Sequence, residues 1–206
     1  MPITERENKK SLLIGTGNRG KAGEFRKLLK DLPLDVLFLS DFENAGEVEE
    51  TGLSFEENAR LKVDGYSHLL PGGWIAAEDS GLVVPALGGD PGIYSARYGN
   101  LESEEERNRL LLDRMQYCRG EERAAFYEAV IVLITPEGED VIFRGRVHGY
   151  IADAPEGDGG FGYDPLFYHP QSGTTFACLT KEEKGKYSHR GLAALALAAY
   201  LNQETA

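Results

Sequence analysis

The chain has 206 residues, 25 of them glycine, and a formal net charge of −12. This length suits one domain or two tightly joined lobes, and it is enough to bury a core without disulfide or metal staples. A pI near 4.8 excludes the basic face that a general nucleic-acid binder or an anionic-membrane binder presents. A small anionic substrate stays compatible, because a few local cations can outweigh the net charge.

The cysteines and the ends of the chain predict a cytoplasmic protein. Cys118 and Cys178 form no paired motif, which argues against a zinc site and fits a reducing compartment. Residues 1–10 are polar, so we expect a disordered extension rather than a secretory leader. The longest apolar run, 191–201, is too short to cross a bilayer. We therefore expect neither a nucleic-acid partner nor a membrane partner.

The first part of the chain alternates strand and helix. Residues 11–16 (SLLIGT) predict a buried strand, and the apolar positions within 22–29 predict a helix after it. Pro33 interrupts the helical pattern, and 34–39 (LDVLFL) predicts a second strand. Strand, helix and strand at this spacing are typical of an α/β fold.

The next helix and strand lead to an acidic motif. Residues 55–70 carry apolar side chains at steps of three and four, which predicts a helix. Ser54 and Glu57 match a capping box at its start. Residues 74–77 predict a short buried strand, and the motif 78–81 (EDSG) lies at its end.

The second half of the chain predicts a mixed sheet. Residues 85–100 are rich in glycine and predict a long loop, and 102–118 predicts an amphipathic helix capped by Ser103. The apolar run 124–134 predicts a central strand. Residues 141–151 alternate apolar and charged side chains, as a half-buried antiparallel strand does.

The last part of the chain returns to loop and helix. Residues 153–165 (DAPEGDGGFGYDP) predict a second glycine-rich loop, and 188–202 predicts the final helix. No repeat and no clear linker interrupts the pattern. We therefore expect residues 11–203 to form a single domain.

A glycine-containing turn lies where the first strand meets the first helix. Unpaired backbone N–H groups at a helix N-terminus suit a phosphate, and glycine lets the backbone approach it closely. An ordinary capped turn explains the same pattern equally well, and the spacing differs from that of a Walker A loop. The candidate phosphate-binding residues are Thr16, Gly17, Asn18, Arg19, Gly20 and Lys21.

An acidic set forms the second candidate site. Asp79 follows a buried strand, which is the usual place for a ligand in an open α/β sheet, and it precedes Ser80. Carboxylates from separate loops suit Mg²⁺, and one of them can act as the base for an attacking water. For Glu49, Glu50 and Glu78, a solvated acidic turn is the competing interpretation.

An aromatic loop forms the third candidate. Phe161 and Tyr163 are flanked by glycines and precede Asp164, so their rings could offer flat faces to a nucleobase. A turn whose aromatic side chains fill the core explains the pattern equally well.

A group of hydrogen-bond donors just before the final helix forms the fourth candidate. Lys184, His189 and Arg190 gather there, and arginine suits bidentate contacts with carbonyl or phosphate oxygens. Charged residues that decorate a helix start are the alternative.

In this order, the four candidates resemble the inosine triphosphate pyrophosphatase family. The motifs span nearly the whole chain after its first ten residues, and GGDPGIYSARY together with SHRG is the most specific combination. The matching segments are TGNRGK (16–21), EETGLSFEENA (49–59), EDSGL (78–82), LGGDPGIYSARY (87–98), GGFGYDPLF (159–167) and TKEEKGKYSHRG (180–191).

The resemblance implies Mg²⁺-dependent hydrolysis of ITP, dITP and XTP to the monophosphate and pyrophosphate, which clears deaminated purines from the nucleotide pool. Asp79 matches the general base and metal ligand of the family. Glu50 matches a second metal ligand, with the adjacent Glu49 as the alternative. The loop 16–21 would hold the triphosphate. The other substrate-binding residues that the resemblance implies are Ser80, Phe161, Gly162, Tyr163, Asp164, Lys184, His189 and Arg190.

The resemblance also implies an architecture. It leads us to expect a mixed, elongated sheet flanked by helices, two lobes with a central substrate cleft, and a homodimer. One position departs from the family pattern, because Glu78 stands where bacterial members usually have aspartate. The substitution keeps the charge and lengthens the side chain, so the family pattern does not define the metal geometry at this position.

Two other functions stay open from the sequence. A related pyrophosphatase could act on modified pyrimidine or methylated nucleotides, and a panel of substrates separates that activity from the first. A regulatory protein could bind nucleotides without chemistry, although the acidic residues Asp79 and Glu50 argue against a lost activity.

Overall fold

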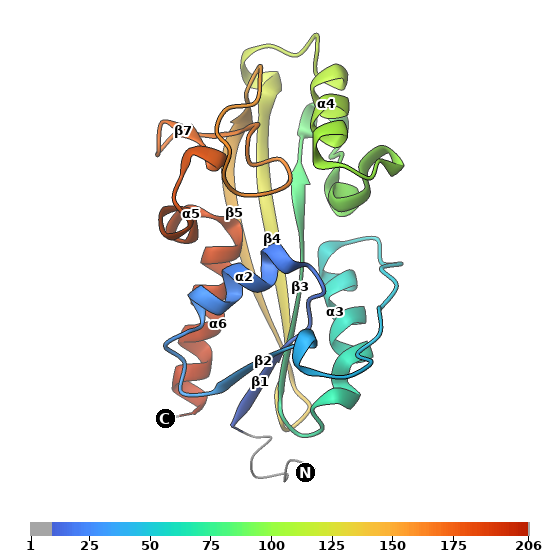
Figure 1. Ribbon diagram of the computed structural model, residues 1–206, viewed down its shortest axis with the longest axis vertical. Helices are drawn as coiled ribbons and strands as arrows, with labels where there is room; N and C mark the ends of the chain where they lie inside the picture. Colours follow the sequence, from blue (N-terminus) through green and yellow to red (C-terminus); the bar gives the residue numbers. More distant parts are fainter. Residues whose placement is uncertain (1–9, 206) are drawn as a thin grey trace. The chain divides into compact units, whose positions relative to one another are not determined.

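The computed structural model describes residues 10–205, which form a mixed, seven-stranded open sheet flanked by helices (Figure 1). The strand order is β2-β1-β3-β4-β5-β6-β7. Strand β1 is parallel to β2 and β3, whereas β6 is antiparallel to β5 and β7. The predicted α/β class with a mixed sheet is confirmed. The extension predicted over residues 1–10 lies, apart from Lys10, outside the described residues.

The elements have the following bounds. The strands are β1 (Ser11–Ile14), β2 (Asp35–Phe38), β3 (Trp74–Val83), β4 (Ala124–Ile134), β5 (Asp140–Ile151), β6 (Phe167–His169) and β7 (Thr174–Thr175). The α-helices are α2 (Arg19–Leu28), α3 (Phe55–Tyr66), α4 (Glu104–Arg114), α5 (Lys181–Tyr187) and α6 (His189–Glu204).

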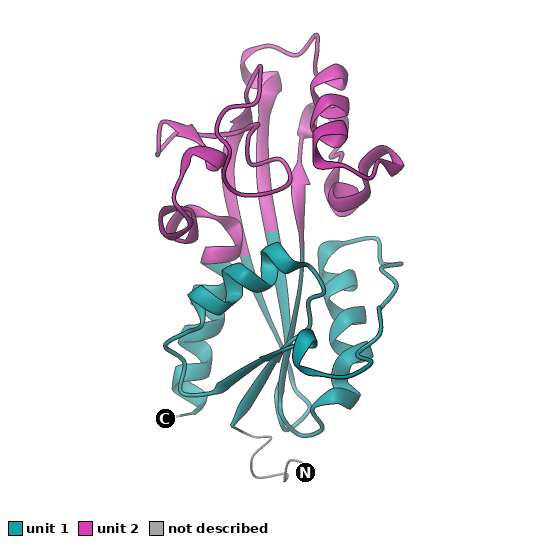
Figure 2. Cartoon of the chain, viewed as in Figure 1, with its two compact units in different colours: residues 1–79, 129–144, 192–206 teal, residues 80–128, 145–191 magenta. Residues whose placement is uncertain are grey.

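The chain divides into two compact units (Figure 2). Unit 1 contains the described residues up to Asp79, residues 129–144 and the described residues from Leu192 onward. Unit 2 contains residues 80–128 and 145–191. Each unit buries a core of its own, and we describe them in turn.

Unit 1 has helices on both faces of its strands, as the alternation of β1 shows. Leu12 and Ile14 pack in one core with apolar side chains of α2 and α6, whereas Leu13 packs in a second core with α3. Strand β3 repeats this pattern, because Trp74 joins the first core and Ile75 the second. Successive side chains of a strand point to opposite faces, so unit 1 is an α/β/α arrangement.

Unit 2 has one core beneath helix α4. Leu111 of this helix and Met115, its C-cap residue, are fully buried and pack with Tyr127 of β4, Val147 of β5 and Phe167 of β6. The rings of Tyr127 and Phe167 lie 4.8 Å apart, centroid to centroid, in a tilted arrangement. This aromatic packing anchors the glycine-rich segment that precedes β6.

Strand β3 is longer than the sequence predicts, and this changes the place of the acidic motif. Residues 74–77 alone read as a strand, but the strand continues to Val83. Asp79 therefore lies inside the strand, and its predicted position at a strand end is wrong. The strand continues because Leu82, beyond the polar residues, is fully buried in the core of unit 2.

The segment before the last helix holds a helix of its own, which the sequence pattern does not predict. Thr180 and Glu183 form a capping box at the start of α5, and Ser188 ends it. A Cβ atom added at Gly191 would collide with the carbonyl oxygen of Gly185, so the close approach of α6 to α5 requires glycine at this position. Strands β6 and β7 are also absent from the prediction, because they are too short for a period of two to show.

Candidate active site

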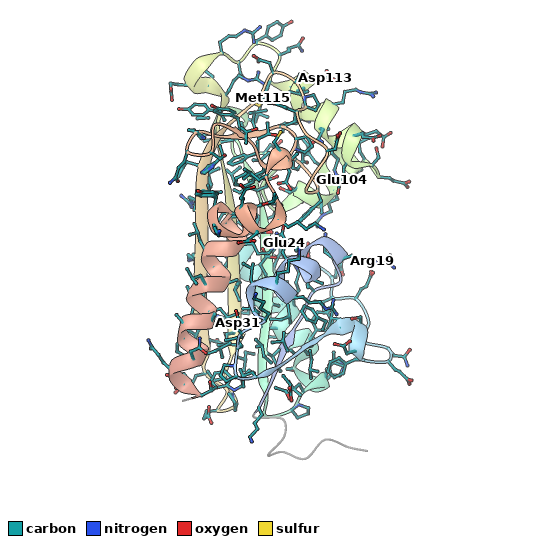
Figure 3. The ribbon with its side chains drawn as sticks, turned by 60° about the vertical axis from the view of Figure 1, so that its left-hand side comes forward. Arg19, Glu24, Asp31, Glu104, Asp113 and Met115 are labelled. Atoms are coloured by element: carbon teal, nitrogen blue, oxygen red, sulfur yellow. The ribbon has the colours of Figure 1, made fainter. Side chains whose placement is uncertain are left out.

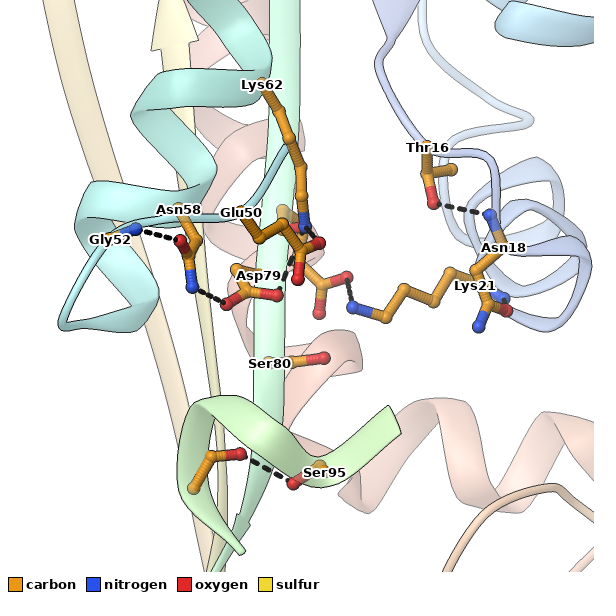
Figure 4. Close-up of polar contacts among 12 residues, drawn as sticks. Thr16, Asn18, Lys21, Glu50, Gly52, Asn58, Lys62, Asp79, Ser80 and Ser95 are labelled. Atoms are coloured by element: carbon orange, nitrogen blue, oxygen red, sulfur yellow. Dashed lines mark hydrogen bonds and ion pairs between the residues drawn. The ribbon is translucent and has the colours of Figure 1, made fainter. Parts of the chain in front are cut away.

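A lysine and two carboxylates meet in unit 1, as Figure 4 shows. Lys62 Nζ of α3 lies 2.6 Å from Glu50 Oε1 and 3.1 Å from Asp79 Oδ1 of β3. The same ammonium donates to the carbonyl oxygen of Glu78 over 3.1 Å. Lys62 therefore holds the loop that carries Glu50 against the polar segment of β3.

Asn58 fixes the other oxygen of Asp79. Its Nδ2 donates to Asp79 Oδ2 over 3.2 Å, and its Oδ1 accepts from the Gly52 N–H over 2.8 Å. Asn58 and Lys62 are four residues apart on α3, which places both on one side of the helix. Both oxygens of the Asp79 carboxylate are thus oriented by side chains of one helix.

The charges of this cluster shift its pKa values. Burial raises the pKa of the Asp79 carboxyl above its ordinary value, although the ammonium groups of Lys62 and Lys21 oppose this shift. Burial alone would lower the pKa of the Lys62 ammonium. The carboxylates of Asp79 and Glu50 raise this pKa by more than burial lowers it, so the pKa of Lys62 is above its ordinary value. Asp79 is therefore a more basic carboxylate than one in water, and Lys62 stays charged at neutral pH.

The predicted phosphate loop lies between β1 and α2, also in unit 1. The Asn18 side chain caps α2 by accepting from the Lys21 N–H over 3.0 Å, and Thr16 Oγ1 accepts from the Asn18 N–H over 3.3 Å. Arg19 is exposed at the first turn of the helix, and Gly17 and the cap residue are exposed as well. The loop thus has an ordered, open backbone in front of a ten-residue helix.

Lys21 has a charged partner on β3. Its Nζ lies 3.2 Å from Glu78 Oε2, and the Glu78 side chain is 1% exposed. The glutamate that departs from the family pattern therefore faces the phosphate loop through a buried ion pair. It links the loop to the strand residue that precedes Asp79.

Replacing Asn58 with alanine is expected to lower the free energy of unfolding by about 2 kcal/mol. The substitution leaves the partly buried Gly52 N–H and one Asp79 oxygen without their partners, and each lost partner costs about 1 kcal/mol or more. Urea denaturation at pH 7.5 measures the change. Asn202→Ala, at an exposed position of α6, is the matched control. Equal stability of the two variants would contradict this role of Asn58.

In unit 2, a buried ion pair lies beneath an aromatic ring. Lys184 Nζ of α5 is 2.6 Å from Asp164 Oδ2, and both side chains are almost fully buried. The same Asp164 oxygen accepts from the Phe161 N–H over 2.8 Å. The ammonium of Lys184 lies 4.6 Å from the centre of the Phe161 ring, a cation–π distance. These contacts hold the glycine-rich loop to α5.

The two basic residues at the start of α6 contact different parts of unit 2. Arg190 Nη2 donates to Ser80 Oγ over 2.9 Å, and the Arg190 Cζ lies 5.6 Å from the Phe161 ring centre. The His189 ring stacks on Tyr127 with centroids 4.5 Å apart and planes 7° from parallel. Arg190 is 1% exposed, so its guanidinium is a desolvated, oriented donor.

The structure brings most of the predicted site residues into these two clusters. Glu50 contacts Lys62 beside Asp79, whereas Glu49 is exposed. Tyr163 is buried, and its hydroxyl donates to the Ser95 carbonyl oxygen over 3.0 Å, so it supports the loop instead of offering a free face.

Sequence reasoning missed Asn58 and Lys62. The signal for them was available: two polar residues four apart run beside the apolar stripe of Ala59 and Val63 on a capped helix. Such a pair on the buried side of a helix indicates a polar contact that the fold must satisfy.

The carboxylates of unit 1 suit a divalent cation. Glu50 and Asp79 supply the oxygen donors that Mg²⁺ prefers, and this ion commonly takes one or two protein carboxylates together with substrate phosphates. Among residues 10–205, no group of three or more His, Cys, Asp or Glu side chains is arranged to hold a metal ion. The pair therefore fits a cation that a phosphate helps to bind. No helix in that part of the chain has the length and apolar character needed to cross a membrane.

The open mixed sheet and the carboxylates that Lys62 joins to the inner strand β3 define an α/β protein with a candidate catalytic cluster. A sequence model of the Ham1 family matches residues 12–200 of this chain. The chain therefore belongs to the Ham1 family. A protein named dITP/XTP pyrophosphatase from Thermus thermophilus is 50% identical over 186 residues, which are 90% of this chain and 89% of that protein.

Two further relatives agree with this assignment. The protein of the same name from Geobacter sulfurreducens is 46% identical over 183 residues, 88% of this chain and 92% of that one. The solved Ham1 protein of Staphylococcus aureus is 41% identical, with a TM-score of 0.84 over 95% of this chain and all of that one. These similarities confirm the resemblance drawn from the motifs.

Proposed function

We propose that this protein hydrolyses the triphosphates of deaminated purines, namely ITP, dITP and XTP, to the monophosphate and pyrophosphate. The observation that carries the proposal is the cluster of Asp79, Glu50 and Lys62. In it, Lys62 and Asn58 orient the buried carboxylate of Asp79, whose pKa is raised. Relatives that share up to 50% of their residues with this chain carry the name dITP/XTP pyrophosphatase.

Asp79 acts as the base in this mechanism. Its carboxylate orients a water toward the α-phosphorus and takes a proton from it as the new P–O bond forms. The bond to the bridging oxygen breaks, and pyrophosphate leaves with the electron pair. Asn58 and Lys62 hold the carboxylate in place, so little reorganisation is needed when the reaction begins.

Positive charge in unit 1 would hold the triphosphate. The exposed backbone at the start of α2 and the ammonium of Lys21 suit phosphate oxygens. Mg²⁺, which Glu50 and Asp79 would hold, supplies charge neutralisation at the phosphates when it is bound. We assign the metal to Glu50 over Glu49, because only Glu50 shares Lys62 with Asp79.

The cluster in unit 2 is assigned to the base. Phe161 offers a ring for stacking, and Arg190 and His189 can donate to the 6-oxo group that hypoxanthine and xanthine share. Adenine has an amino donor at that position, so these desolvated donors would be left without acceptors. Ser80, Gly162, Asp164 and Lys184 complete this group.

A panel of substrates tests the proposal. Initial rates with Mg²⁺ on ITP, XTP, dITP, GTP, ATP, UTP and dTTP are expected to give the highest kcat/KM for the first three. Preference for UTP or dTTP would indicate the pyrimidine activity instead. Binding without turnover of any nucleotide would indicate a regulatory protein.

Replacing Arg190 with alanine is expected to narrow the ratio of kcat/KM for ITP to that for ATP by about tenfold or more, because a desolvated donor to the 6-oxo group disappears. Parallel kinetics on both nucleotides measure the ratio. Arg109→Ala removes an arginine at an exposed position of α4 and is the matched control. An unchanged ratio in Arg190→Ala would remove this residue from base recognition.

We further propose that the protein works in the cytoplasm as a homodimer on free nucleotides. The low cysteine content supports a cytoplasmic location. The family resemblance supports the homodimer. Light scattering at micromolar concentration gives the oligomeric state directly.

A further inference from the structure

We infer that Glu104 and Asn108 of α4 are positioning residues for base binding, because they hold both backbone groups of Gly162 in the aromatic loop. The inference rests on the proposed function and deepens it. Neither residue belongs to the motifs that carry the family resemblance. Figure 3 labels Glu104 near the start of α4 and Met115 just past its end.

The contact is a two-point clamp from one helix. The Gly162 N–H donates to Glu104 Oε2 over 2.8 Å, and Asn108 Nδ2 donates to the Gly162 carbonyl oxygen over 3.1 Å. Glu104 and Asn108 are four residues apart, so both lie on the same side of α4. Gly162 lies outside the strands of the sheet, so its N–H and carbonyl groups have no partners from a neighbouring strand. The side chains of Glu104 and Asn108 supply these partners instead.

The clamp controls two peptide planes. The N–H of Gly162 belongs to the peptide shared with Phe161, and its carbonyl belongs to the peptide shared with Tyr163. Fixing both groups therefore fixes the backbone on either side of the glycine, which has a φ of +65°. Glycine adopts this left-handed conformation at little cost, and without the clamp it would also leave it easily.

Phe161 is the side chain that this arrangement places. Its N–H is held by Asp164, and its ring lies over Lys184 at 4.6 Å and near Arg190 at 5.6 Å. A ring that stacks on a base must keep its plane within narrow limits, so a loop held on one side only would bind the base less tightly. Asp164 holds the loop at Phe161, and Glu104 and Asn108 hold it at the next residue, Gly162.

Glu104 and Asn108 differ in their exposure to solvent, and this allows a positioning role to be distinguished from a purely structural one. Glu104 is exposed, so its substitution leaves the core unchanged. Asn108 is 8% exposed, and among the described residues its Oδ1 has no hydrogen-bond partner. Its side-chain contribution to the loop is therefore the single bond to Gly162. Asn108→Leu keeps the branched shape of the side chain and removes that bond.

Steady-state kinetics on ITP test the inference. Glu104→Ala and Asn108→Leu are each expected to raise KM about fivefold, the fold-change that corresponds to the loss of one net hydrogen bond, with kcat within twofold of the parent. Glu104→Gln is expected to restore KM, because the glutamine oxygen still accepts from the Gly162 N–H. Glu105→Ala removes the same charge from the same turn and is the matched control.

The outcomes separate this inference from the proposed function. A parent protein that releases no pyrophosphate from ITP contradicts the proposed function itself. With an active parent, a KM for Glu104→Ala equal to that of Glu105→Ala overturns the inference. A Glu104→Gln variant that behaves like Glu104→Ala overturns it too, because charge and not hydrogen bonding would then matter. If Asn108→Leu does not fold, the three glutamate variants still decide.

Discussion

Asp79→Asn is expected to lower the kcat for pyrophosphate release from ITP by at least about 10³-fold while nucleotide binding persists. Asparagine keeps the shape and the contact with Asn58 but cannot take a proton from water, and general-base catalysis contributes about 10²–10⁴-fold. Under the proposed function, the loss of a carboxylate ligand to Mg²⁺ would add to the effect. Quenched assays of pyrophosphate measure the rate, and calorimetry with ITP measures binding.

The same variant is expected to lose less stability than Lys62→Met, which is described next. Burial raises the pKa of Asp79, which means that the ionised carboxylate costs the fold free energy at neutral pH. Asparagine removes that cost, but its single oxygen can accept from Lys62 or from Asn58 and not from both. Asp64→Asn, at an exposed position of α3, is the control that should keep parental activity. Parental turnover in Asp79→Asn would refute the assignment of the base.

Lys62→Met is expected to lower the free energy of unfolding at pH 8 by about 3 kcal/mol. The substitution leaves the carboxylates of Glu50 and Asp79 in a largely buried place without the ammonium that compensates them, and such losses cost about 3–5 kcal/mol in buried pairs. The side chain of Glu50 is 26% exposed, so we expect the lower end of that range.

The loss in Lys62→Met depends on pH in a defined direction. Without Lys62, the folded-state pKa of Asp79 rises further above its unfolded value, so the penalty is absent when the carboxyl is protonated. The stability difference from the parent therefore grows as pH rises from 5 to 8. Urea melts at both values measure it, with Lys27→Met on the exposed face of α2 as the control. A difference that is constant or shrinks with pH would contradict this account of the cluster.

The sequence predicted the class of the fold because its strands have clear periods. Leu12, Leu13 and Ile14 form a fully buried run, and 141–151 alternates, so a mixed α/β sheet followed from pattern alone. The length of β3 did not follow, because the polar residues Glu78, Asp79 and Ser80 break the apolar run. Burial of Leu82 in a second core keeps the strand together, and this contact is nonlocal.

In the candidate site, too, the sequence predicted the residues that lie in motifs and missed those whose role depends on nonlocal contacts. Asp79 and Arg190 stood out because they lie in specific motifs, and the structure places both on buried elements. Lys62 and Asn58 did not stand out, since a lysine and an asparagine on a helix usually face water. Only their partners on β3 reveal that they orient a carboxylate, and those partners are 17 and 21 residues away in the sequence.

The choice between Glu49 and Glu50 also needed the structure. Adjacent residues have the same chemistry, and no spacing rule distinguishes them. The structure places Glu50 within 2.6 Å of Lys62 and leaves Glu49 exposed. On this contact we base our proposal that Glu50, and not Glu49, is the second metal ligand.

The most direct test of the proposed activity is product analysis of ITP turnover in ¹⁸O-labelled water. Attack at the α-phosphorus predicts equal amounts of inosine monophosphate and pyrophosphate, with the label in the monophosphate alone. Orthophosphate as the first product, or label in the pyrophosphate, would contradict the proposed reaction.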